Sequence, residues 1–331
     1  MKFIELRNKY NTEVVLSTVG ASIYDIKTLD YENRFESIIY TTKDKYEFNT
    51  ERSQLGKTIG RTAGRISDSK FKLNGKLYKI PSYDKNGLHG GLDGLSYKEF
   101  SYKRVDLEEY IEVEFYYKSK DLESGYPGNL DLRVIYRLYN TENKLTLTYK
   151  GVSDKDTLLN LSNHSYFNLS GNAKRDIMNH MLYINASNME EIKNLLPQGI
   201  VPCKKIYSFK NMHKIGDYIN DKEIKDNTNG YDFPYIFDDL SGYQVILKDD
   251  VSKRVLKIKT TYPAVVVYTC NFVGHEIMNN RLPMKPYYAV CLECMYHPNT
   301  INSSFLEEKR DILKKGEEYN ETIEYTFGLE V

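Results

Sequence analysis

Two of the six histidines lie among small and polar residues that a plain core strand would not contain. His89 lies within residues 86–91, where flanking glycines allow unusual backbone angles and leave room for a ligand beside the imidazole. His164 lies in a strand-like segment, residues 161–169, whose apolar face is interrupted by polar side chains. A turn residue in the first case and a hydrogen-bonded core histidine in the second are the structural alternatives.

Two carboxylates stand out because a charge at their positions is costly unless it is paired. Asp232 lies tight against aromatic neighbours, and Glu293 interrupts the apolar run of residues 290–295. Burial is expected to raise the pKa of Glu293, as a general base working near neutral pH requires. A buried ion pair is the alternative for both acids, with Arg65 as a candidate partner. Two histidines, two acids and an arginine suit proton transfer on a neutral, hydroxylated ligand.

Motifs for other chemistries are missing from the sequence. It contains no phosphate-binding loop, dinucleotide fingerprint, nucleophile elbow or zinc-protease helix motif. Its four cysteines are too few for a disulfide framework. Cys291 and Cys294 form a C-x-x-C spacing, but they lie in a strand-like run, where residues three apart point to opposite faces. No second cysteine pair completes a Cys₄ zinc site, whereas a mixed Cys and His site stays open on spacing alone.

The composition excludes several classes of partner. The 331 residues include 46 Lys and Arg against 46 Asp and Glu, so the basic surplus that binds nucleic acid or anionic membranes is missing. The mean hydropathy is −0.57, and no run of about 18 apolar residues predicts a spanning helix. Charges interrupt the first seven residues, where a signal peptide needs an apolar stretch. We therefore expect a cytoplasmic protein without nucleic-acid or membrane partners.

The dominant hydrophobic period is two residues, which predicts strands. Alternating runs occur at residues 111–117, 132–138, 145–149, 256–258 and 323–327. Asn74-Gly75 predicts a hairpin turn, since both residues tolerate positive φ angles. The expected helices are residues 43–51 and 188–196, and residues 217–230 are expected to form a surface loop. The prediction is an all-β fold, a single large antiparallel β-sandwich formed by one domain spanning residues 1–331.

Five segments together resemble the galactose mutarotase, or aldose 1-epimerase, family. They occur in the family's order and span most of the chain: residues 60–66, 88–91, 163–169, 230–232, and 292–293 followed by 298–302. The resemblance implies a large antiparallel β-sandwich. It also implies that Glu293 is the general base at the anomeric hydroxyl and that His164 is the general acid at the ring oxygen. Arg65, His89 and Asp232 would bind the sugar, and neither a metal nor a cofactor is implied.

Four departures from the family pattern imply a more apolar sugar-recognition shell. They are Gly64, Phe233, Val266 and Met295, which stand where the family often has Asn, His, Gln and Gln. The leading hypothesis is an aldose 1-epimerase for a free aldohexose of the galactose or glucose type, acting as a monomer or homodimer. A carbohydrate-binding protein with little or no catalysis is the alternative. A metal-dependent sugar enzyme is a third hypothesis, since histidines and carboxylates also bind metals.

Overall fold

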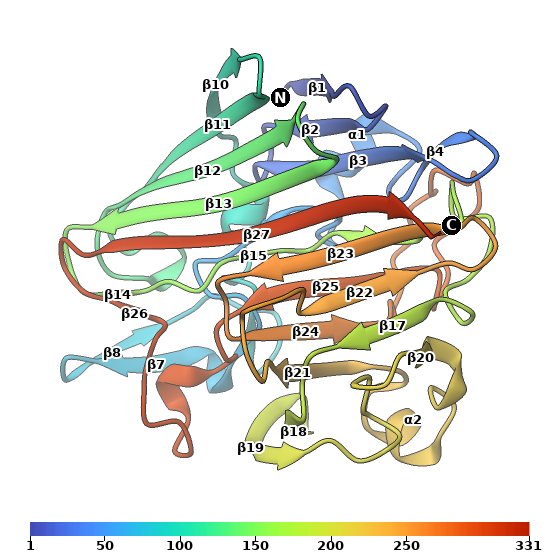
Figure 1. Ribbon diagram of the computed structural model, residues 1–331. Helices are drawn as coiled ribbons and strands as arrows, with labels where there is room; N and C mark the ends of the chain where they lie inside the picture. Colours follow the sequence, from blue (N-terminus) through green and yellow to red (C-terminus); the bar gives the residue numbers. More distant parts are fainter. Residues whose placement is uncertain (331) are drawn as a thin grey trace.

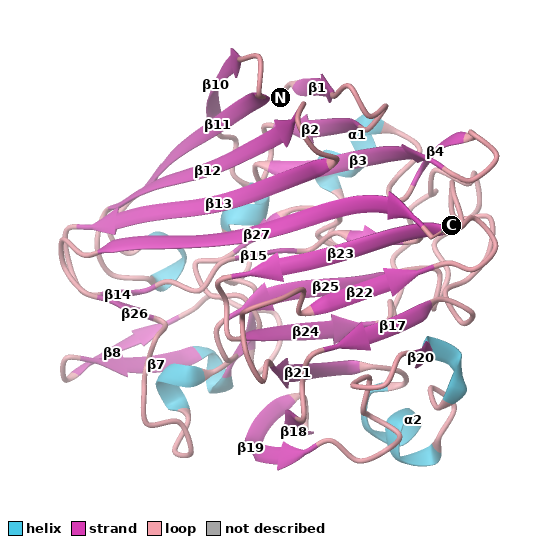
Figure 2. Ribbon diagram, viewed as in Figure 1, coloured by secondary structure: helices cyan, strands magenta, loops and turns pink. Residues whose placement is uncertain are grey.

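The computed structural model describes residues 1–330, and antiparallel β-strands dominate it (Figures 1 and 2). The larger of two main sheets has nine strands. In spatial order they are β10 (Ser101–Asp106), β11 (Tyr110–Ser119), β12 (Leu130–Tyr139), β13 (Lys144–Ser153), β27 (Glu318–Leu329), β23 (Arg254–Thr260), β22 (Val245–Lys248), β17 (Met181–Ile184) and β20 (His213–Lys214). Hairpin connections join β10 through β13, and the chain returns at its end to place β27 beside β13.

The second main sheet has six strands and lies against the first (Figure 1). In spatial order they are β16 (Tyr166–Phe167), β25 (Val290–Met295), β24 (Ala264–Tyr268), β21 (Asp232–Ile236), β18 (Asn188–Lys193) and β19 (Leu196–Pro202). Three of these strands, β25, β24 and β21, contain the later segments that the sequence singled out.

Smaller sheets and short helices complete the described structure. A four-stranded sheet contains β1 (Phe3–Arg7), β2 (Glu13–Ser17), β3 (Ser22–Leu29) and β4 (Phe35–Ser37). The two-stranded pairs are β5 (Thr58–Ile59) with β15 (Ser162–Asn163), β6 (Arg65–Ile66) with β9 (Gly87–Leu88), β7 (Lys70–Leu73) with β8 (Lys76–Lys79), and β14 (Thr157–Leu158) with β26 (Ile312–Leu313). The α-helices are α1 (Lys45–Thr50) and α2 (Lys222–Thr228). Within residues 1–330, no helix is long and apolar enough to cross a membrane.

The main hydrophobic core lies between the two large sheets. Alternate residues of the nine-stranded sheet, including Val113, Val134 and Leu147, are fully buried in it. Leu292 and Cys294 of β25 enter the same core from the six-stranded sheet. Each buried aliphatic side chain contributes about 1.5–3 kcal/mol, so this layer holds the two sheets together. Because side chains alternate along a strand, the opposite face of the six-stranded sheet is free to build a site.

The structure confirms the β-sandwich and the period-two strands. The five alternating runs fall within β11, β12, β13, β23 and β27. The predicted hairpin is formed by β7 and β8, with positive φ at both turn residues. The first predicted helix is confirmed as α1, whose N-cap Asp44 accepts hydrogen bonds from the backbone amides of Tyr46 and Glu47.

Two local predictions are wrong. Residues 188–196 form β18 and the start of β19 rather than a helix, because β18 pairs with both β21 and β19. The turn between them uses Asn194 and Leu195 at positive φ, without the glycine that would have signalled it. Residues 217–230 include α2, which begins after Asp221, a side chain that accepts a hydrogen bond from the backbone amide of Glu223.

Candidate active site

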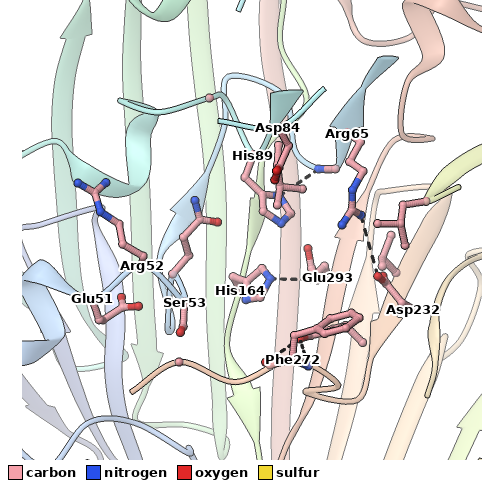
Figure 3. A pocket seen from close by; sticks show the side chains of 18 of the residues that line it. Glu51, Arg52, Ser53, Arg65, Asp84, His89, His164, Asp232, Phe272 and Glu293 are labelled. Atoms are coloured by element: carbon pink, nitrogen blue, oxygen red, sulfur yellow. Dashed lines mark hydrogen bonds and ion pairs between the residues drawn. The ribbon is translucent and has the colours of Figure 1, made fainter. Parts of the chain in front are cut away.

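The five residues that the sequence singled out line one cavity of about 800 Å³. They are Arg65, His89, His164, Asp232 and Glu293. Figure 3 shows His164 and Glu293 side by side, with Arg65 and Asp232 together on one side of them and Glu51, Arg52 and Ser53 on the other. Five chain segments separated by up to 228 positions therefore meet at one place.

Glu293 reaches the cavity because of the alternation along β25. Its neighbours Leu292 and Cys294 enter the core, so the Glu293 side chain leaves the opposite face of the strand. Val266 of β24 is its partner in the register and also lines the cavity. Glu293 is only 2 % exposed, and its partner in the structure is His164 rather than Arg65.

His164 lies between the short strands β15 and β16, and its backbone is fixed on both sides. Its amide donates to the carbonyl of Lys57 at 3.0 Å, and its carbonyl accepts from the amide of Gly56 at 2.9 Å. The imidazole packs beside the rings of Tyr166 and Tyr268, with centroids 5.0 Å and 6.2 Å away. Its Nε2 lies 3.4 Å from Oε1 of Glu293. The ring is therefore held with one nitrogen facing the carboxyl group.

His89 follows β9 and adopts a positive φ of 49°. Its amide donates to the carbonyl of Gly64 at 3.0 Å, and the amide of Gly64 donates to His89 Nδ1 at 3.1 Å. Because Nδ1 accepts this bond, the neutral ring carries its proton on Nε2 and acts as a donor there. The residue after His89 must be a glycine, since a Cβ at position 90 would lie 1.8 Å from the carbonyl oxygen of Gly60.

Asp232 and Arg65 form the ion pair that was the structural alternative for Asp232. Arg65 Nη1 lies 4.0 Å from Asp232 Oδ2, and both side chains also line the cavity. Burial raises the pKa of Asp232, and the guanidinium of Arg65 opposes that shift. At 4.0 Å the pair is loose, which leaves both groups able to bind a hydroxyl group of a ligand.

Burial moves the pKa values of the central pair in opposite directions. It lowers the pKa of His164 to about 4 and raises the pKa of Glu293 well above its usual range. Asp232 adds to the shift of Glu293, while Arg65 opposes it. Burial also lowers the pKa of His89, with smaller contributions from His164 and Arg65. Both shifts favour the uncharged forms of the two groups, a neutral imidazole beside a protonated carboxyl, so one proton can be exchanged across the 3.4 Å contact.

A metal-binding arrangement was one hypothesis, and three donors are close enough to test it. His89, His164 and Glu293 offer ligand atoms within 4.8 Å of one another, and two histidines with one glutamate is a ligand set that zinc accepts. However, Nδ1 of His89 accepts the Gly64 amide, and its Nε2 then carries a proton and has no lone pair to donate. The arrangement of His89 favours a hydrogen bond to a ligand over metal coordination.

The four departures from the family pattern do not all face the cavity. Gly64, Val266 and Met295 line it, and Val266 and Met295 pack with Ile59 and Ala63 into an apolar cluster. Phe233 does not, because it alternates with Asp232 on β21 and packs in the core, 4.9 Å from the ring of Tyr207. The expectation that Phe233 alters the sugar shell is therefore wrong.

One part of the cavity lining, residues 50–54 and 272–276, carries no motif that could be recognised in the sequence. Residues 50–54, including the buried Glu51 and Gln54, line the cavity opposite the Arg65 and Asp232 side, and residues 272–276 also line it. Glu51 forms an ion pair of 2.6 Å with Lys57, and neither side chain is exposed. A carboxylate and a lysine six residues apart in a polar segment look like surface residues, so no sequence signal marks this buried pair.

Comparison with known proteins agrees with this architecture. The aldose 1-epimerase family profile matches residues 2–326. An aldose 1-epimerase from Haemophilus influenzae is 31 % identical over 339 residues, covering 98 % of this chain and 95 % of its own length. A galactose mutarotase from Sus scrofa is 30 % identical over 317 residues, covering 94 % and 89 %.

Solved structures show the same fold. A GalM/aldose epimerase homologue from C. elegans superposes with a TM-score of 0.90 at 25 % identity, covering 99 % of both chains. A galactose 1-epimerase from Lactobacillus acidophilus gives a TM-score of 0.86 at 26 % identity, covering 99 % of this chain and 95 % of its own. The fold is thus a galactose mutarotase-like antiparallel sandwich, and the class of enzyme is an isomerase. The chain belongs to the aldose 1-epimerase family, whose reaction is the interconversion of sugar anomers.

Proposed function

We propose that this chain is an aldose 1-epimerase that interconverts the α and β anomers of a free aldohexose of the galactose or glucose type. Glu293 is the general base and His164 is the general acid. The observation that supports these roles is the 3.4 Å contact between the two buried groups inside the cavity. Their pKa values are shifted in opposite directions, as expected for an acid/base pair that shares a proton.

The reaction uses the form of the pair in which the shared proton is on His164 Nε2. Glu293 is then a carboxylate and accepts the proton of the anomeric hydroxyl. His164 donates its Nε2 proton to the ring oxygen, so the C1–O5 bond breaks and the open-chain aldehyde forms. Rotation about the C1–C2 bond presents the other face of the aldehyde, and the reversed proton transfers close the ring as the other anomer. The pair ends with the number of protons it began with.

His89, Arg65 and Asp232 hold the sugar in the orientation that this transfer needs. His89 presents an N–H donor beside His164, whose ring centroid is 5.2 Å away. Arg65 donates and Asp232 accepts, and hydrogen bonds to charged groups are roughly twice as strong as neutral ones. The apolar cluster around Val266 and Met295 forms another part of the wall, where it limits hydrogen bonding to the sugar. This wall is the part of the site that we expect to set the preference between aldohexoses.

Polarimetry on freshly dissolved α-D-galactose and α-D-glucose tests the proposal directly. Wild-type protein should accelerate the change in rotation, and Glu293→Gln and His164→Asn should each remove most of that acceleration. Glu190→Gln is a matched control, since Glu190 is also buried and paired with a histidine, His297, outside the cavity. It should leave the rate unchanged.

A variant at Glu293 or His164 that keeps the wild-type rate would contradict the assigned roles. Sugar binding measured by calorimetry without any acceleration would instead support the binding-only alternative. The intact His164–Glu293 contact favours catalysis over that alternative.

A further inference from the structure

Cys291 and Glu293 leave the same face of β25, because they are two residues apart on a strand. Both contact the ring of His164, one at each nitrogen. Glu293 Oε1 lies 3.4 Å from Nε2, and Cys291 Sγ lies 3.7 Å from Nδ1, within hydrogen-bonding reach of sulfur. A single strand face therefore holds the imidazole at both ends.

The thiol of Cys291 is enclosed and stays neutral. Its side chain is fully buried between its register partners, Tyr166 on β16 and Tyr268 on β24. Burial raises the pKa of this thiol, with Glu293 contributing in the same direction. A buried cysteine of this kind is normally an inert core residue, but here its sulfur faces the one ring nitrogen of His164 that Glu293 does not contact.

We propose that Cys291 is a positioning residue that accepts a hydrogen bond from Nδ1–H of His164 and so reserves Nε2 for the proton that is transferred. The inference rests on the acid role of His164 proposed above. During ring opening Nε2 must gain and release a proton, whereas Nδ1 must keep its own. If Nδ1 lost its proton to become an acceptor, Nε2 would be locked as an N–H donor, as it is in His89.

A sulfur acceptor suits this task better than a carboxylate would. Carboxylate partners stabilise imidazolium strongly and hold its proton. The neutral sulfur is a weak acceptor, so it fixes the ring and the tautomer while leaving the Nε2 proton easy to release. The ring also has little freedom to compensate, since its backbone is bonded on both sides to residues 56 and 57.

Steady-state kinetics of Cys291→Ala, with Cys294→Ala as the control, test the proposal. The two cysteines lie on the same strand, both are fully buried, and only Cys291 shares the face of Glu293. We expect Cys291→Ala to lower kcat roughly ten- to hundredfold with little change in KM, because the groups that bind the sugar remain. Cys294→Ala should keep kcat close to wild type. Equal kcat values in the two alanine variants would overturn the proposal.

Cys291→Ser adds a conservative variant. Its hydroxyl accepts hydrogen bonds but has a shorter reach than sulfur, so it should recover part of the kcat that alanine loses. A serine variant no more active than the alanine variant would count against a hydrogen-bonding role.

Nitrogen NMR of the His164 ring separates this proposal from the proposed function. With the signals assigned by comparison with His164→Asn, wild-type Nδ1 should have the chemical shift of a protonated nitrogen. An unprotonated Nδ1 would refute the proposal even if the enzyme is active. Conversely, a protonated Nδ1 that loses this signature in Cys291→Ala would establish the hydrogen bond from His164 to Cys291. If His164→Asn nevertheless stayed active, that hydrogen bond would stand and the assigned acid role would fail.

Discussion

Lowering the pH to about 5.5 should cost almost none of the rate of anomerisation through protonation of His164. The active pair carries one shared proton, and it becomes inactive when His164 and Glu293 are both protonated. Burial lowers the pKa of His164 to about 4, so about 3 % of the molecules hold the second proton at pH 5.5. With an ordinary histidine pKa of about 6.5, roughly nine molecules in ten would be inactive and the rate would fall about tenfold.

The pKa shifts of His164 and Glu293 determine where the pH–rate profile falls on its acid side and on its basic side. Activity is lost as the pH falls through the lowered pKa of His164, when the pair gains its second proton. It is lost again at high pH, when the shared proton leaves the pair, and burial moves that limb upward by raising the pKa of Glu293. The expected profile of kcat/KM therefore has its acid limb below pH 5.5, so it extends further on the acid side than a histidine with an ordinary pKa would allow, and its basic limb is shifted upward.

Polarimetry or a coupled assay of one anomer gives this profile, with the uncatalysed rate at each pH subtracted. Glu293→Gln supplies the second baseline, since it should stay close to the uncatalysed rate throughout. An acid limb with its midpoint near pH 6.5 would refute the reasoning, because it would mean that burial does not depress the pKa of His164. Circular dichroism at pH 5.5 checks that the fold is intact, so that lost structure is not mistaken for a second proton.

Two further predictions concern stability. Lys57→Met should cost about 3–5 kcal/mol in urea unfolding, because it leaves the buried Glu51 carboxyl without its partner, and adding Glu51→Leu should recover part of that loss. A double variant less stable than Lys57→Met would contradict this account. Burial raises the pKa of Asp311 to about 7, so the wild type should lose about 3 kcal/mol as the pH rises from 4 to 7, because the unfolded chain ionises this group more readily than the folded protein over that range. Asp311→Asn should remove that part of the slope, and parallel curves for the two proteins would show that the carboxyl is not shifted.

Strands with one buried face could be predicted from the sequence because their apolar and polar residues alternate with a period of two. β11 shows it best, with Ile111, Val113 and Phe115 buried and the glutamates between them facing outward. The β18–β19 hairpin could not be predicted, because its short apolar pattern also fits a helix and its turn lacks glycine. The hydrogen-bonded pairing of β18 with β21, which is distant in sequence, makes this segment a strand.

Much of the candidate site was predictable, since each of its five residues lies in a recognisable segment. The prediction for Phe233 was wrong although the alternation of side chains along β21 could have corrected it. Because Asp232 faces the cavity, its neighbour Phe233 must face the core. The meaning of Gly64 was hidden for a different reason. Its φ is +74°, and a Cβ there would lie 2.8 Å from Cβ of Pro298, a contact between residues far apart in the chain. The glycine is thus required by the backbone, and what looked like a lost polar contact is also a steric necessity.

The alternation along β25 separates two kinds of selection on adjacent residues. Positions 291, 293 and 295 face the cavity side, whereas positions 292 and 294 fill the core between the sheets. Substrate preference can therefore drift at every second position while the intervening positions conserve the fold. In a saturation library of this strand, substitutions that reduce turnover and substitutions that reduce the amount of folded protein should fall at alternating positions. The constraint imposed by the reaction and the constraint imposed by the fold can therefore be measured separately within one six-residue segment.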